Sequence, residues 1–88
     1  MNFLSALGLV VRVARLNAKL SQERLAQDAG LYRNTVGLIE RGEISVSIDT
    51  LKKISDQLGY RPWELLLEAE FVLDEAAEES ARSAKMKS

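Results

Sequence analysis

The fold is decided by residues 22–41, which read QERLAQDAGLYRNTVGLIER. Apolar residues recur there at spacings of three and four on both sides of Gly30, which indicates two short helices. Gly30 tolerates the positive φ angle that a tight turn needs, and Ala26 is small enough for two helix backbones to approach. The stretch therefore predicts two helices that cross at a tight turn. Their shared interior is expected to contain Leu25, Ala29, Leu31, Val36 and Ile39.

The second of these helices also has an outward face that the shared interior does not use. The helical period places on this face Arg33, Asn34, Gly37, Leu38 and Arg41. These are the side chains that can meet a partner, although an exposed arginine can also be an ordinary surface cation.

Helical periodicity continues over the rest of the chain, which holds one proline and five glycines. We expect an all-α fold of five helices, at about residues 3–18, 22–29, 33–41, 48–58 and 62–83. Ser21 and Ser47 are good N-cap residues, and Gly30 and Gly59 can end helices in the left-handed conformation. Pro62 is a favoured first-turn residue for the fifth helix.

One compact domain is expected over residues 1–66, with a C-terminal helix extension over residues 67–88. The fourth helix is expected to bury one face, formed by Ile48, Leu51, Ile54 and Leu58. The residues from about 83 onward lack an apolar face and are expected to fray.

The composition removes most kinds of enzyme site. Cysteine and histidine are absent, which excludes disulfides, Cys/His zinc sites, haem ligation and the commonest general base. The only carboxylate cluster is Glu75, Glu78 and Glu79, on a helix expected to be solvated and without a nearby nucleophile. We therefore expect no catalytic activity, no metal and no cofactor.

The net charge of −1 hides an asymmetry along the chain. Residues 1–63 carry a net +3 and residues 64–88 a net −4. This asymmetry indicates a mildly basic binding module with an acidic appendage, while a mixed solvated surface is the alternative. No apolar run approaches the roughly 18 residues that span a bilayer, and no cationic segment precedes the first apolar residues. A cytoplasmic protein is expected.

Five short motifs match one known family together. They are Leu20-Ser21-Gln22, Leu25-Ala26, Ala29-Gly30-Leu31, Ile39-Glu40-Arg41-Gly42, and Ser47-Ile48 with Thr50-Leu51. Through them the chain resembles the Cro and phage-repressor (Xre) type of helix-turn-helix over about residues 7–66. The Glu40-Arg41-Gly42 stretch also resembles small controller-type regulators. The resemblance implies a lambda-repressor-like fold and a sequence-specific regulator of transcription that binds double-stranded DNA.

The resemblance also implies which residues meet DNA, because the family places its third helix in the major groove. The base-reading residues would be Arg33, Asn34 and Leu38. An arginine can donate to guanine O6 and N7, an asparagine can pair with adenine, and a leucine can only meet a thymine methyl. Contacts to the DNA backbone would come from Gln22, Thr35, Tyr32, Arg12 and Arg41.

An ion pair between Arg15 and Glu40 is implied as a structural element. The chain also departs from the family at three positions. Tyr32 stands where Ser or Thr often caps the recognition helix, Lys19 where glycine is common, and Val46 where proline is frequent. Tyr32 can either reach the DNA backbone or pack against the domain.

A single such domain covers about half a turn of duplex, so two copies on half-sites about 34–36 Å apart are expected. The fifth helix offers more apolar surface than the core requires, which marks it as a homodimer interface. The expected interface residues are Trp63, Leu66, Leu67, Phe71, Leu73 and Ala76. The alternative is that Trp63, Leu66 and Leu67 belong to the core and that the chain from Phe71 onward only frays.

A second class of function stays open. In it, the acidic helix over residues 68–79 docks on another protein, as in an antitoxin-like module. No membrane partner and no small-molecule effector are expected, and control by the protein's own concentration at its own gene is the preferred hypothesis.

Overall fold

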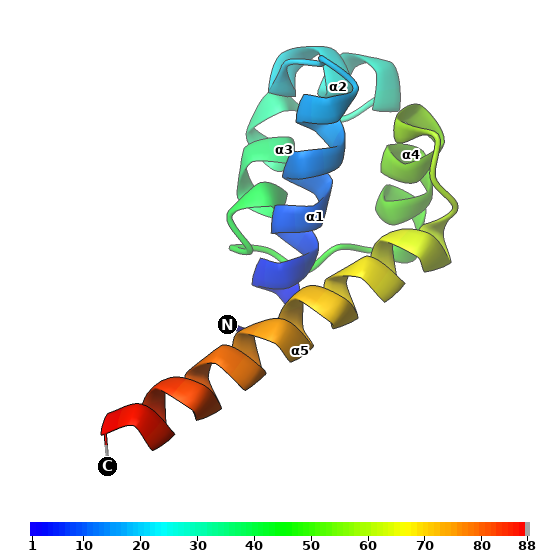
Figure 1. The fold of residues 1–88 in the computed structure, drawn as a ribbon. Coiled ribbons are helices and arrows are strands. Elements are labelled where there is room, and N and C mark those ends of the chain that lie inside the picture. Colours follow the sequence, from blue (N-terminus) through cyan, green and yellow to red (C-terminus); the bar gives the residue numbers. More distant parts are fainter. Residues whose placement is uncertain (88) are drawn as a thin grey trace.

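The computed structural model describes residues 1–87, and within them all regular structure is helical (Figure 1). The helices are α1 (Phe3–Asn17), α2 (Gln22–Ala29), α3 (Arg33–Glu40), α4 (Ile48–Leu58) and α5 (Pro62–Lys87). The all-α, five-helix prediction is confirmed. In Figure 1, α1 to α4 form a compact bundle, and α5 crosses its lower end and extends beyond it.

The helix ends follow from capping groups in the sequence. Asn2, Ser21 and Ser47 each accept a hydrogen bond from the backbone N–H three residues on, at 2.8, 3.0 and 3.1 Å. Gly30 and Gly59 end α2 and α4 with φ angles of 69° and 75°. Because each cap supplies a partner for an orphan backbone group, these short helices begin and end where the sequence predicts.

The core lies where α1 packs against both α3 and α5. Leu65 and Ala69 of α5 are completely buried in it, so the packed part of α5 continues past the expected domain boundary at Leu66. The buried apolar cluster consists of Ala6, Leu7, Val10, Val11, Leu25, Ala26, Val36, Ile39, Leu51, Ile54, Leu65 and Ala69.

Backbone-to-backbone packing fixes α3 against α1. A methyl group at Gly8 of α1 would lie 2.6 Å from the carbonyl oxygen of Glu40. A Cβ at Gly42, where φ is 69°, would lie 2.7 Å from the Cα atom of Ser5. Only glycine fits at either place, and the helix that carries the candidate site is thereby held at short distance from α1.

Two further features differ from the sequence expectation. The helix α5 is continuous to Lys87, beyond the end expected near Ser83, because its Ala, Arg, Lys and Met residues favour helix even without an apolar face. Ile48 was expected to be buried, and this is wrong because its side chain is 79% exposed. It is the first residue of α4 and lies one turn before the packed Leu51, at the end of the helix where the core no longer covers it.

Candidate nucleic-acid interface

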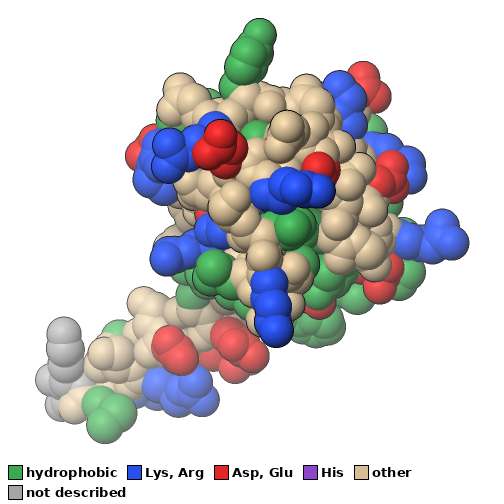
Figure 2. Space-filling view, turned by 90° about the horizontal axis from the view of Figure 1, so that it is seen from above, with side chains coloured by type: hydrophobic (Ala, Val, Ile, Leu, Met, Phe, Trp, Pro, Cys, Tyr) green, Lys and Arg blue, Asp and Glu red, His purple; other side chains and the backbone are tan. Residues whose placement is uncertain are grey.

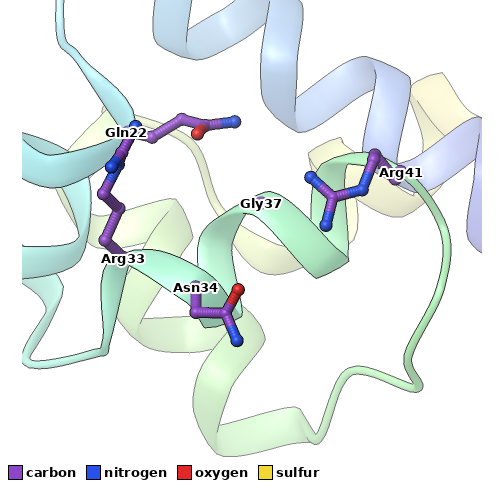
Figure 3. Close-up of a pocket in the computed structure, with 5 residues that line it drawn as sticks. All are labelled: Gln22, Arg33, Asn34, Gly37 and Arg41. Carbon is purple, nitrogen blue, oxygen red and sulfur yellow. The ribbon is translucent and has the colours of Figure 1, made fainter.

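A hollow of about 390 Å³ joins the start of α2 to the outward face of α3. It is lined by Gln22, Arg33, Asn34, Gly37 and Arg41. In Figure 3, the Gln22 amide and the Arg41 guanidinium point toward one another across Gly37, while Asn34 points away from the helix. Two arginines and two amides around one open hollow offer several hydrogen-bond donors to a ligand with exposed acceptors.

The sequence-predicted base-reading residues are not all equivalent in the structure. Arg33 and Asn34 are exposed in the first turn of α3 and line the hollow. Leu38 is half-buried and does not line it, which leaves part of its side chain for an apolar contact.

Of the residues predicted to meet a DNA backbone, only Gln22 and Arg41 line this hollow. Tyr32 is 84% exposed, so it does not pack against the domain, and it borders a neighbouring hollow with Arg33. Thr35 is half-buried on α3. Arg12 is exposed on α1 and lines neither hollow.

A buried ion pair lies next to Gln22, one of the residues that line the hollow. The Arg15 Nε atom donates to Glu40 Oε2 at 2.6 Å, and Arg15 Nη2 donates to Glu40 Oε1 at 3.1 Å. Gln22 Nε2 also donates to Glu40 Oε1, at 3.1 Å. The network therefore links α1, α2 and α3, and it fixes the Gln22 side chain at the edge of the hollow.

Arg41 has a more central place than the sequence suggested. It occupies the C-cap position of α3, yet its Nη1 atom lies only 3.1 Å from where a Cβ of Gly37 would be. Its Nε atom pairs with Glu43 Oε2 at 3.3 Å. The sequence does not predict this pairing, because no spacing rule shows where a flexible arginine will lie.

The positive charge of the described surface is distributed. Figure 2 shows Lys and Arg side chains standing singly, several with Asp or Glu beside them. Arg24 pairs with Asp28 at 3.1 Å and Lys52 pairs with Asp56 at 2.6 Å. Ion pairing of this kind reduces the attraction of these two cations for a polyanion. Residues 1–87 contain no acidic cluster suited to a metal ion and no helix apolar enough, at the necessary length, to span a membrane.

The predicted interface residues on α5 fall into two groups. Trp63, Leu67 and Phe71 are 60%, 44% and 60% exposed, and we call these three the α5 apolar face. Leu66 and Leu73 instead pack partly against the core, and Ala76 is half-buried.

Comparison with known proteins gives consistent matches. The model of the family described as Helix-turn-helix matches residues 11–65. Control protein C.BamHI of Bacillus amyloliquefaciens is 45% identical over 60 residues, which cover 67% of this chain and 74% of that protein. The clp gene regulator ClgR from Corynebacterium glutamicum superposes with a TM-score of 0.82 at 26% identity, over 99% of this chain and 95% of that chain. The nucleoprotein complex of the restriction-modification controller protein C.Esp1396I gives a TM-score of 0.68 at 28% identity, over 78% and 94% of the two chains.

Proposed function

This chain belongs to the helix-turn-helix family, in its Cro and phage-repressor (Xre) type, and from that premise we propose that it binds a two-fold symmetric operator as a homodimer. Members of this kind are DNA-binding regulators of transcription, and that general function holds for this chain. The observation that carries the finer proposal is that Arg33 and Asn34, in the first turn of α3, line one hollow with Gln22 from the start of α2.

In the proposed complex α3 enters the major groove with its first turn toward the base edges. Arg33 donates to O6 and N7 of a guanine, and Asn34 pairs with an adenine. Leu38 touches a thymine methyl with the exposed part of its side chain. Gln22, Thr35, Tyr32 and Arg12 fix the register through the sugar-phosphate backbone, which carries no sequence information directly.

The homodimer is proposed to form through α5. The α5 apolar face presents three large side chains to solvent in a single chain, which is unusual unless a partner covers them. In an isologous dimer the same patch of each copy meets the other across a two-fold axis. Three half-buried side chains would lose their remaining exposure at the edge of this dimer interface. They are Leu66, Leu73 and Ala76.

The likeness to control protein C.BamHI supports a role as a controller-type regulator. We propose that the protein binds upstream of its own gene and that its concentration sets the occupancy of the site. Footprinting on that upstream region tests this, and a region without protection at saturating protein would contradict it.

Selection of duplexes from a random pool, run in parallel with the wild type and Arg33→Ala, tests DNA recognition directly. The expected result is a two-fold symmetric consensus in which the variant loses preference at one base pair of each half-site. If folded wild-type protein enriches no sequence, DNA recognition is rejected and a protein partner for the acidic residues of α5 becomes the better proposal.

A further inference from the structure

We propose that Arg41 is a third base-reading residue, which recognises a guanine from the middle of the α3 face, and that Gly37 and Glu43 set its position. The inference rests on the proposed function. It changes the role of Arg41 from a contact to the DNA backbone, as the sequence suggested, to a determinant of specificity.

The first observation is the space that Gly37 leaves. Gly37 is buried although it lies on the outward face of α3, and the side-chain atoms nearest to its missing Cβ belong to Arg41 and Gln22. The closest of these atoms are Arg41 Nη1 at 3.1 Å, Gln22 Oε1 at 3.8 Å and Arg41 Cζ at 3.9 Å. Because there is no side chain at Gly37, the guanidinium reaches back one turn from the end of the helix and lies over its centre (Figure 3).

The second observation is the orientation that Glu43 gives to this guanidinium. The Glu43 carboxylate forms an ion pair with Arg41, in which Glu43 Oε2 lies 3.3 Å from Arg41 Nε. The backbone that carries this carboxylate is itself held in place. The Glu43 N–H donates a hydrogen bond to the Leu38 carbonyl oxygen of α3, at 2.9 Å. The two terminal Nη groups are left to donate as a fork, which is the geometry that guanine O6 and N7 accept.

The charge of the pair favours a base over a phosphate as the target. Arg41 and Glu43 are both about half exposed, and together they carry no net charge. The fork can donate to two phosphate oxygens as well as to guanine O6 and N7. The Glu43 carboxylate, however, repels a phosphate and not the neutral edge of a guanine, so the pair favours the base.

The position over Gly37 also predicts where the base lies. Gly37 is four residues after Arg33, a rise of about 6 Å along the helix. Successive base pairs are about 3.4 Å apart, so the base read by Arg41 should lie within about two pairs of that read by Arg33.

Duplex selection followed by affinity measurement tests the inference with Arg41→Ala, Arg41→Lys and Gly37→Leu. All three should lose preference for guanine at one base pair, by a factor on the order of 10 to 100, while the pair read by Arg33 stays selected. Arg41→Lys keeps the charge and loses the fork, so it should leave the salt dependence unchanged. Gly37→Leu should act by occupying the place of the guanidinium, since the atom nearest to the new Cβ is Nη1 of Arg41, at 3.1 Å.

Glu43→Gln tests the orienting role. It should raise affinity for all DNA by removing a negative charge, and it should also reduce the guanine preference attributed to Arg41. Higher affinity with an unchanged preference would overturn the role of Glu43. Lys53→Ala, which removes an exposed cation of α4 outside the hollow, is the control and should leave every base preference in place.

Failure of this inference can be told from failure of the proposed function. If Arg33→Ala relaxes one base pair but Arg41→Ala weakens all duplexes equally and lowers the salt dependence, Arg41 meets a phosphate and only the inference is wrong. If the folded wild type enriches no sequence, the proposed function fails first.

Discussion

Gly8 of α1 lies directly against the backbone carbonyl group of Glu40, so that a Cβ there would be 2.6 Å from that oxygen. Gly8→Ala should therefore lower the free energy of unfolding by about 1–3 kcal/mol, because rigid backbone must move to admit the methyl group. Urea denaturation measures this loss. Gly37→Ala is the matched control in another helix, and it should keep or raise stability because the atoms nearest to the new methyl group belong to the side chains of Arg41 and Gln22 rather than to backbone. Equal stability of the two variants would contradict the close approach.

Removing one partner of the buried Arg15–Glu40 pair should destabilise the fold strongly. Their side chains are only 9% and 3% exposed, so Arg15→Leu leaves an uncompensated carboxylate in the interior. The expected loss in the free energy of unfolding is about 3–5 kcal/mol, with part of it recovered in the double variant Arg15→Leu/Glu40→Leu. A single variant that loses less than about 1 kcal/mol would show that water reaches the pair.

Lys19→Gly should stabilise the protein. Lys19 has a φ angle of 59°, a left-handed conformation that costs about 1–2 kcal/mol for a residue with a Cβ. Glycine relieves this strain, and its greater freedom in the unfolded chain offsets part of the gain. We expect about 1 kcal/mol, or a rise in Tm of about 4–8 °C, by calorimetry. Lys19→Ala keeps the Cβ and should give no comparable rise, so an equal rise would point to the lysine charge instead.

Tyr32→Ser should separate stability from DNA binding. Tyr32 is the N-cap residue of α3 but its side chain makes no capping hydrogen bond. A serine there should add about 1 kcal/mol to the free energy of unfolding. The same change should weaken DNA binding without altering the selected sequence, because an exposed contact to the backbone is lost. Unchanged affinity would remove Tyr32 from the proposed interface.

Charged substitutions on the α5 apolar face should yield monomers. Trp63→Glu and Phe71→Glu place a carboxylate on a surface that the proposed dimer covers, and neither side chain is part of the buried core. Sedimentation at micromolar concentration should show a dimer for the wild type and a monomer for each variant, with operator affinity reduced. A monomeric wild type would rule out the dimer.

Much of the fold was predictable because it is local. Ser21, Ser47, Gly30 and Gly59 cap helices through groups within a few residues, and sequence spacing expresses such contacts directly. The approach at Gly8 was not predictable, because it depends on how closely two helices far apart in the sequence pack. Helical periodicity also predicted wrongly that Ile48 is buried. A periodic pattern describes the faces of one helix and does not show where the neighbouring helices end.

The candidate site was likewise predictable only in part. Arg33 and Asn34 follow from the outward face of a helix and the family resemblance, and the structure does place them at one hollow with Gln22. The central position of Arg41 needed two facts that no spacing rule contains. One is the side-chain rotamer over Gly37, and the other is the loop closure that brings Glu43 to its Nε atom.

The packing of α5 on α1 ties the activity of the protein to the order of its synthesis. A nascent chain that has left the ribosome as far as Gly59 contains every proposed DNA-reading residue, but it lacks Leu65 and Ala69, which complete the core. The recognition surface is therefore expected to become stable only once α5, which also carries the proposed pairing surface, has been made.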